Sequence, residues 1–442
     1  MFYIVEKENC LNALQSLIKL GCFVDIIPSN FNYHPKLTST VAVYIKLLTT
    51  GKGFIIPLTH TEGINVTKER VYELLASTDK LYTLNKKELL YHFNLQCAID
   101  LSLLYSMNKF DKLEYNRSSK IINSFYSKYK DVRNINEIIP ITKLYESSET
   151  IFNGIEHIID FDIPNGFDFY NKTATNVFFL LEQSGVGIKY DAFNKIFKPK
   201  DPLYNTLDNR ALSQYNLYNV TSRPTNSFNS VNFAAIPHTE EHRKCFTPVN
   251  DYFVEFDFDG YHLRLLAEQI EYQLTSESAH KQLARLYFNK KEITDDEYKQ
   301  AKQINFHAIY GKIPEKYGHL DVFKGIDDYI KKLWKRYKDD GEVLAPISGK
   351  PFTTALKKMN PQKLMNYVMQ SLETSRNIVI LKELLKYLNN KKTTISLYTY
   401  DSIIMDFNKE DGKDTLEDIK NIMEEGGKYP VSFKYSKDLS LW

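Results

Sequence analysis

The sequence predicts a chain of two parts, an α/β domain at the N-terminus followed by a larger α+β region. Over the first third of the chain, apolar runs typical of strands alternate with helical patterns. In the second half, two strand-like runs that end in Asp257 and Asp401 flank a long stretch of helical patterns. We therefore expect one sheet built from distant segments, with a helical insertion between them.

The composition is that of a large and nearly neutral protein. The chain has 442 residues, of which 43% are hydrophobic, enough for the cores of two or three domains. With 57 basic and 55 acidic residues, phosphate binding would depend on local patches rather than on net charge. No apolar run is long enough to span a membrane and no signal peptide follows Met1, so we expect a cytoplasmic protein without membrane contact.

The first 150 residues carry the α/β alternation. Strands are expected at 2–5, 21–27, 41–47 and 53–58, and helices at 9–20 and 68–76. Residues 151–210 contain a helix-and-turn pattern at 173–188 and then a short polar stretch rich in Asn, Asp, Tyr and Pro. That stretch is too short and too polar for a pair of long helices.

One helix is expected to present a cation and aromatic rings together. Tyr298, Lys302, Phe306 and Tyr310 are spaced four apart and so share one helix face. Opposite two strand-borne carboxylates, such a face suits a magnesium-bound triphosphate. Taken singly, an aspartate after a strand is most often a turn residue, and such a stripe is most often a half-buried surface with a snorkelling lysine.

The order of the two acidic runs and the helix along the chain favours a nucleotide-binding site over unrelated turn and surface residues. The series of an acidic strand, a basic and aromatic helix, and a second acidic strand resembles motifs A, B and C of the family A (DNA polymerase I-like) DNA polymerases. The resemblance extends over about the C-terminal half of the chain. The matching segments are Asp257 to Arg264, Tyr298 to Gly311, and Tyr400 to Ser402. The resemblance implies that Asp257 and Asp401 are catalytic and hold two Mg²⁺ ions, for which Mn²⁺ could substitute.

The same resemblance implies roles for the nucleotide-facing residues. Lys302 would contact the triphosphate, Phe306 would lie against the incoming deoxynucleotide, and Tyr310 would sit beside the templating base. His262 replaces the family's glutamate under the sugar, where it would help exclude ribose. Arg243, in a stretch similar to the one that leads into motif A, is a candidate phosphate ligand.

Further matches concern the primer-template DNA. Thr221 to Arg223 and Asn232 to Pro237 resemble segments that grip it, which implies that Arg223 and Asn232 contact DNA. Asn366 and Gln370 match a pair that faces the duplex, placed here before a helix expected to start near Ser371. A further basic and aromatic run, residues 331–338, fits either template contact or a solvated amphipathic helix.

By resemblance, the fold is an exonuclease-like (RNase H-like) α/β domain at 1–150 and a vestigial thumb or linker at 151–210. An antiparallel palm at 211–270 and 360–442 and helical fingers at 271–359 complete it. Proofreading is expected to be lost, because Ile27 stands where the family has the second metal-binding acid of its exonuclease site, after Asp25. Only Glu88 and Glu149 are left as further candidates for the acids of that site. The bias toward Asn, Lys, Ile and Tyr indicates an AT-rich genome, compatible with a phage, whose protein would work in the host cytoplasm.

Two departures from the family leave two functions open. Tyr298 replaces the leading arginine of motif B, and Ser402 replaces the acid after Asp401, for which Asp259 or Asp406 could substitute. The first hypothesis is a template-directed DNA polymerase without proofreading, with a processivity or replication partner left open. The alternative is a catalytically weak or inactive polymerase-fold protein that acts as a DNA-binding replication factor.

Overall fold

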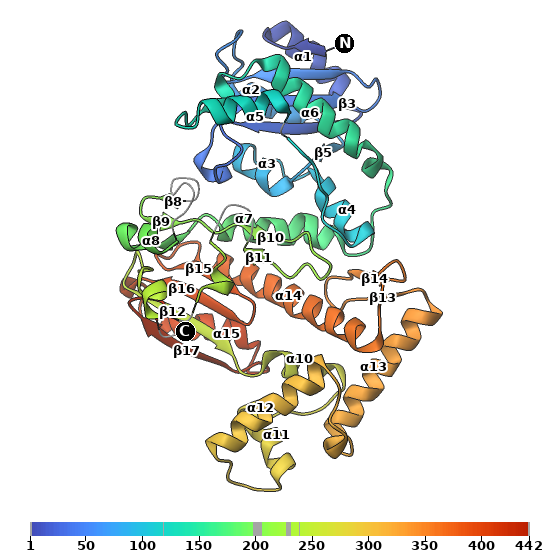
Figure 1. Cartoon of the computed structure of the whole chain (residues 1–442), viewed down its shortest axis with the longest axis vertical. Coiled ribbons are helices and arrows are strands. Elements are labelled where there is room, and N and C mark those ends of the chain that lie inside the picture. The colour runs from blue at the N-terminus through green and yellow to red at the C-terminus, as the bar shows by residue number, and fades with distance from the viewer. Residues whose placement is uncertain (1, 118, 198–205, 227–230, 238, 441–442) are drawn as a thin grey trace. The chain divides into compact units, whose positions relative to one another are not determined.

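The computed structural model describes residues 2–117, 119–197, 206–226, 231–237 and 239–440 (Figure 1). These residues form two compact units. The main stretch of the first unit runs to Phe179, beyond residue 150 where the sequence analysis placed the end of the first domain. The second unit contains most of the remainder.

A six-stranded mixed sheet forms the centre of the first unit, in the order β1-β4-β3-β2-β5-β6. Its members are β1 Phe2–Ile4, β2 Cys22–Pro28, β3 Thr40–Leu47, β4 Gly53–Pro57, β5 Leu81–Thr83 and β6 Ile99–Asp100. β2 and β3 pair antiparallel and are buried along their whole length, as expected for runs rich in β-branched and aromatic residues. The four strands predicted before residue 60 are confirmed.

Helices cover both faces of this sheet. They are α1 Glu8–Ile18, α2 Lys68–Ala76, α3 Lys86–His92, α4 Leu101–Lys109, α5 Lys120–Lys128 and α6 Ile141–Ile155. Leu14 of α1 and Leu74 of α2 share a core with Val24 and Val43. On the opposite face, Phe152 of α6 packs on Phe23, whose side chain points away from Val24. The predicted helices at 9–20 and 68–76 are confirmed.

An antiparallel four-stranded sheet forms the centre of the second unit, in the order β15-β16-β12-β17. Its strands are β12 Tyr252–Phe258, β15 Thr394–Thr399, β16 Ser402–Phe407 and β17 Val431–Ser436. Asp257 on β12 pairs with Ser402 on β16, so the two acid-bearing runs lie side by side as predicted. Asp401 lies in the two-residue turn that joins β15 to β16 rather than on a strand.

The segment between β12 and β15 is mostly helical. It contains α10 Tyr261–Gln269, α11 Ala279–Phe288, α12 Asp295–Tyr310, α13 Asp321–Asp339, the hairpin β13 Glu342–Leu344 and β14 Pro351–Thr353, and α14 Pro361–Leu388. Thr294 and Glu297 start α12 with a capping box. The expectation that a helix starts near Ser371 is wrong, because Asn360 caps the helix and Pro361 occupies its first turn.

Short elements connect the first unit to β12. These are α7 Thr175–Leu181, β7 Val186–Gly187, α8 Tyr190–Phe197, β8 Thr206–Leu207, β9 Arg210–Ala211, β10 Tyr215–Asn216, β11 Thr225–Asn226 and α9 Glu240–Lys244, and α15 Asp414–Glu424 lies between β16 and β17. Within described residues 182–197 and 206–226, α8 is the only helix, and it has eight residues. Residues 198–205, part of the predicted polar stretch, lie outside the described residues.

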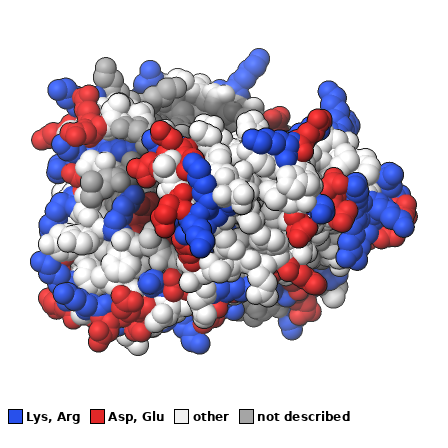
Figure 2. Space-filling view, turned by 90° about the horizontal axis from the view of Figure 1, so that it is seen from below, with Lys and Arg blue, Asp and Glu red and all other residues white. Residues whose placement is uncertain are grey.

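The surface and the helices carry two further observations. Figure 2 shows Lys and Arg interspersed with Asp and Glu over one face, as the balanced composition predicts. Among the helices that the structure describes, none combines the length and the apolar character needed to cross a membrane.

Candidate functional site

A cavity of about 300 Å³ lies within the second unit, where the turn after β12 meets α12, α14 and the β15–β16 turn. Twelve residues line it: Arg223, Gly260, Tyr261, His262, Leu263, His280, Lys302, Phe306, Ile309, Tyr310, Glu373 and Asp401. Six of these were predicted from the sequence, namely Arg223, His262, Lys302, Phe306, Tyr310 and Asp401. Segments that are far apart in the chain therefore meet at one place.

The two predicted catalytic aspartates are neighbours. The amide of Phe258 donates a hydrogen bond to the carbonyl of Asp401 (3.2 Å), which joins the end of β12 to the β15–β16 turn. Although the side chain of Asp257 is exposed, desolvation by surrounding atoms and the charges of Asp401 and Glu255 raise its pKa to about 7. Desolvation and the charge of Glu373 likewise raise the pKa of Asp401. Two carboxylates that repel each other in this way would be stabilised by a cation.

The turn that carries Asp401 is strained and held from two sides. Tyr400 has a positive φ of 64°, a conformation that costs a non-glycine residue about 1 kcal/mol or more. Asn377 of α14 donates to the Tyr400 carbonyl (2.7 Å), and the Arg223 guanidinium lies 3.8 Å from the centre of the Tyr400 ring. These contacts hold the turn in a conformation that its own residues do not favour.

The aromatic face of α12 points into the cavity as predicted. The Phe306 ring is 61% exposed and lies 4.7 Å from the ring of Tyr310, so one of its faces is free to stack on a planar ligand. The ammonium of Lys302 lies 5.2 Å from the centre of the Tyr298 ring, in a cation–π contact. Tyr298 thus supports the ammonium of Lys302 from the preceding turn of α12.

Glu373 is a site residue that the sequence analysis missed. It lies on α14, is 1% exposed, and forms ion pairs with Arg223 (3.0 Å) and His262 (3.1 Å). His262 in turn hydrogen-bonds the phenol of Tyr310. Burial would raise the pKa of Glu373, but the adjacent His262 and Arg223 lower it overall. The available signal was spacing, because Glu373 continues the face of α14 that holds Asn366 and Gln370.

His280 was also missed. It lies on α11 and lines the cavity together with Lys302. Desolvation lowers its pKa, and the positive charge of Lys302 lowers it further while Asp259 opposes the change. No motif singled it out, because only the packing of α11 against α12 brings it to the cavity.

A buried lysine supports the loop that carries Arg223. Lys350 donates to the hydroxyl of Ser222 (2.5 Å) and to the carbonyl of Asn219 (3.2 Å). Asn219 in turn donates to the carbonyl of Arg223 (2.6 Å). Desolvation by burial lowers the pKa of Lys350 to about 7. These bonds stabilise Ser222, whose φ is 54°, and so direct Arg223 toward the cavity.

The other predicted DNA-facing and phosphate-facing residues lie outside the cavity lining. Asn366 on α14 donates to the carbonyl of Tyr310 (3.4 Å), and Gln370 is one turn further along the same helix. Asn232 precedes a single 3₁₀ turn, 233–235. The guanidinium of Arg243 donates to the carbonyls of Pro237 (3.2 Å) and Ile236 (3.3 Å), so its cation faces backbone oxygen atoms.

The two acids considered as substitutes for the missing motif C acid have other partners. Asp259 accepts from Arg264 (3.1 Å) and from the amide of Ala279 (2.8 Å). Asp406 is buried at the far end of β16, roughly 15 Å along the strand from Asp401, where it accepts from the amides of Val249 and Asn250. The carboxylate whose charge acts on Asp401 is instead that of Glu373.

Cations also hold the acids that remain of the expected exonuclease site in the first unit. Arg117 donates to both carboxylate oxygens of Asp25 (2.7 and 2.6 Å), and Ser148 donates a third bond (2.7 Å). Glu149 pairs with Lys46 and accepts from the phenol of Tyr145. A guanidinium and an ammonium thus neutralise these carboxylates.

The donor set at the cavity fits magnesium. Across the described residues there is no group of three or more His, Cys, Asp or Glu side chains that could hold a metal ion. Mg²⁺ bound with a nucleotide does not need such a group, because it keeps several waters and takes one or two carboxylates plus phosphate oxygens. Asp401, which lines the cavity, and Asp257, on the adjacent strand β12, would supply those two carboxylates.

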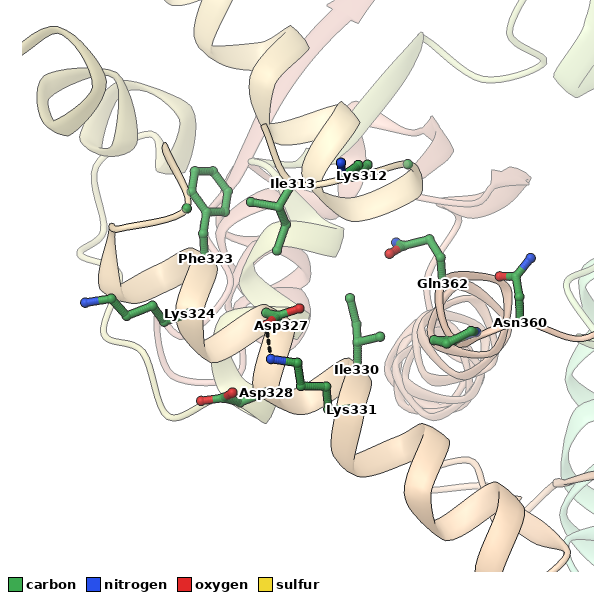
Figure 3. Close-up of a pocket in the computed structure, with 13 residues that line it drawn as sticks. Lys312, Ile313, Phe323, Lys324, Asp327, Asp328, Ile330, Lys331, Asn360 and Gln362 are labelled. Atoms are coloured by element: carbon green, nitrogen blue, oxygen red, sulfur yellow. Dashed lines mark ion pairs between the residues drawn. The ribbon is translucent and has the colours of Figure 1, made fainter. Parts of the chain in front are cut away.

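A second cavity, of about 760 Å³, lies between the residues that follow α12, the helix α13 and the start of α14 (Figure 3). Ile313, Phe323 and Ile330 form an apolar wall, and Lys331 is paired with Asp327 (2.5 Å). One face of α13 is buried, at Ile330, Leu333 and Tyr337. The basic run 331–338 therefore belongs to an amphipathic helix, which was one of the two interpretations of this run from the sequence.

Among the comparisons with known proteins, the one with solved structures found a match. No family model matches the chain, and no curated protein sequence matches it. A solved structure described as the POL domain of Pol1 from M. smegmatis, in complex with DNA primer-template and dNTP, is similar with a TM-score of 0.69 at 12% identity. The similarity covers 100% of this chain and 99% of that one. This chain therefore has a fold similar to that of a DNA polymerase domain.

Proposed function

We propose that this protein is a template-directed DNA polymerase that adds deoxynucleotides to a primer 3′ end with two Mg²⁺ ions. The observation that carries the proposal is the cavity in which Asp401 meets Lys302, Phe306 and Tyr310, with Asp257 on the adjacent strand. The polymerase-like fold supports it, although the roles of the residues rest on the motifs and on this geometry.

Each residue at the cavity has a separate role in the proposed nucleotidyl transfer. Asp257 and Asp401 hold the metal ions, which when bound would stabilise the charge on the attacking and leaving oxygens. Lys302 contacts the triphosphate, with His280 beside it as a second polar group. The exposed ring of Phe306 lies against the incoming base, and Tyr310 with His262 closes the side where a ribose 2′-hydroxyl would sit.

DNA is held by residues around the cavity. Arg223, Asn232, Asn366 and Gln370 contact the primer-template duplex, and Arg243 contacts a phosphate once its guanidinium leaves the backbone.

The rest of the chain follows the family organisation in reduced form. In this proposal, residues 1–150 are an exonuclease-like domain without proofreading, because cations hold Asp25 and Glu149. Residues 151–210 are a vestigial thumb, 211–270 with 360–442 the palm, and 271–359 the fingers.

Primer extension tests the proposal. The wild-type protein should extend a labelled primer with Mg²⁺. Asp401→Asn should reduce the rate about a thousandfold, because loss of a carboxylate that would hold the metal ions should raise the barrier by several kcal/mol. Primer-template binding by fluorescence anisotropy should change at most a few-fold. Glu383→Gln, which removes an exposed acid from α14, is the matched control.

One observation favours the alternative function. Ser402 stands where motif C has an acid after its aspartate, and Asp259 and Asp406 are each bonded to other partners. A DNA-binding replication factor would bind primer-template and yet show no extension with Mg²⁺ or Mn²⁺. That result would replace the first proposal by the second.

A further inference from the structure

We propose that Glu373 positions the sugar-selecting and the DNA-reading side chains together, so that discrimination against ribose and discrimination against a mismatched primer end share one carboxylate. This inference rests on the proposed polymerase function. Its basis is that a single buried carboxylate contacts both His262 and Arg223.

The burial of Glu373 makes the two contacts interdependent. Its side chain is 2% exposed, so water cannot replace a lost partner. An isolated carboxylate in such a place is strongly unfavourable, and paired cations make it tolerable. Arg223 approaches both carboxylate oxygens, with its Nε 3.0 Å from Oε2 and its Nη2 3.3 Å from Oε1. His262 Nε2 shares Oε2 at 3.1 Å.

The contact with Glu373 determines how His262 presents itself to a nucleotide. A carboxylate oxygen of Glu373 faces the Nε2 edge of the His262 ring. The other ring nitrogen, Nδ1, faces the phenol of Tyr310. Glu373 therefore sets the ring orientation of His262 and, through it, the position of the Tyr310 hydroxyl at the proposed ribose-excluding side.

The contact with Glu373 also determines the position of Arg223. The guanidinium lies between the carboxylate and the Tyr400 ring, next to Asp401. Without Glu373 the guanidinium would keep the stacking contact but lose its ion pair, and its direction toward the duplex would loosen. In the proposed polymerase Arg223 contacts the primer-template, so a guanidinium that is held less firmly should distinguish a matched from a distorted, mismatched primer end less well.

Glu373 belongs to a polar stripe along α14. Asn366, Gln370, Glu373 and Asn377 are spaced by four, three and four residues, which places them on one helix face. Asn366 bonds the carbonyl of Tyr310, while Asn377 bonds the carbonyl of Tyr400 and the phenols of Tyr261 and Tyr398. Glu373 stands in the middle of this stripe and carries its only ionisable side chain.

The test is Glu373→Gln, which keeps the shape of the side chain but removes its charge. Two ratios are measured by single-nucleotide insertion with Mg²⁺: deoxynucleotide over ribonucleotide, and matched over mismatched primer end. Each should fall about tenfold, the usual effect of losing a buried charged hydrogen bond. Ratios do not respond to an inactive fraction of protein, so a merely structural defect would leave both unchanged. Glu383→Gln is the control and should change neither ratio.

A double variant separates the effect of Glu373 on the sugar ratio from its effect on the mismatch ratio. In a His262→Ala background, adding Glu373→Gln should have no further effect on the sugar ratio, because the gate is already gone, but should still lower the mismatch ratio. If Glu373→Gln does not fold, Glu373→Asp keeps the charge on a shorter side chain and should lower the same ratios. Unchanged ratios in a folded variant that extends primers would overturn the inference. Failure of the wild-type protein to extend any primer would instead reject the proposed function.

Discussion

Replacing Asp257 by asparagine should stabilise the metal-free protein while it removes activity. In the folded protein the pKa of Asp257 is raised from 3.8 to about 7 by desolvation, by Asp401 and by Glu255. Between these values the folded state binds a proton that the unfolded chain has released, so stability falls as the pH rises from about 4 to 7. A buried group with this pKa would lose several kcal/mol, but Asp257 is exposed and solvent screening reduces the loss to about 1 kcal/mol.

Thermal unfolding at pH 8 and pH 5 measures this effect. At pH 8 Asp257→Asn should unfold about 2 °C above the wild type, the shift that about 1 kcal/mol gives in a domain of this size. At pH 5 the difference should be smaller, because the wild-type carboxyl is then largely protonated. Added Mg²⁺ should raise the unfolding temperature of the wild type at pH 8 and leave that of the variant unchanged. A stabilisation equal at both pH values, or shared by the control Glu383→Gln, would refute the argument from charge repulsion.

The remaining predictions concern degradation, processivity and sugar selection. The protein should not shorten a labelled mismatched primer in the presence of Mg²⁺, and magnesium-dependent shortening that Asp25→Ala abolishes would contradict this prediction. Arg117→Ala should destabilise the first unit by about 3 kcal/mol in urea unfolding, because it leaves the buried Asp25 without its cation. Synthesis should be distributive, because α8, with eight residues, is the only helix in the described residues 182–197 and 206–226, which offers little surface to wrap a duplex. Products of hundreds of nucleotides under a heparin trap would show that another segment holds the duplex. Finally, His262→Ala should raise ribonucleotide insertion relative to deoxynucleotide insertion, since it removes the ring that contacts Tyr310, and an equal ratio in both proteins would exclude His262 from the gate.

The elements with a strong local pattern could be predicted from the sequence. β2, β3 and α2 lie where apolar runs and helical periodicity placed them, because the spacing of side chains along a strand or helix is a local property. The same holds for the face of α12 that carries Lys302 and Phe306. The start of α14 was missed by ten residues, since the capping role of Asn360 was not recognised.

Contacts between distant segments were decided by the tertiary structure. The sequence shows Glu373 only as an acid on a helix. The approach of the Arg223 loop and of α10 makes it the buried neighbour of a guanidinium and an imidazole. Asp25 and Arg117 are 92 residues apart, and Arg243 turns toward backbone carbonyls. The first pair joins distant segments, whereas Arg243 bonds carbonyls only six and seven residues before it in the chain.

The sequence by itself therefore determined which side chains could carry the chemistry, and the tertiary structure decided which of them meet. Asp257 and Lys302 could be singled out as candidates because each stands in a short motif on one strand or helix, and Asp401 because it directly follows the strand-like run 394–399. The ion-pair partners of Glu373, the supports of the strained Tyr400 turn and the cations that neutralise the first unit's acids were not. The physical reason is that secondary structure follows from periodicity within a few residues, whereas the pairing of buried charges depends on which distant segments exclude water together.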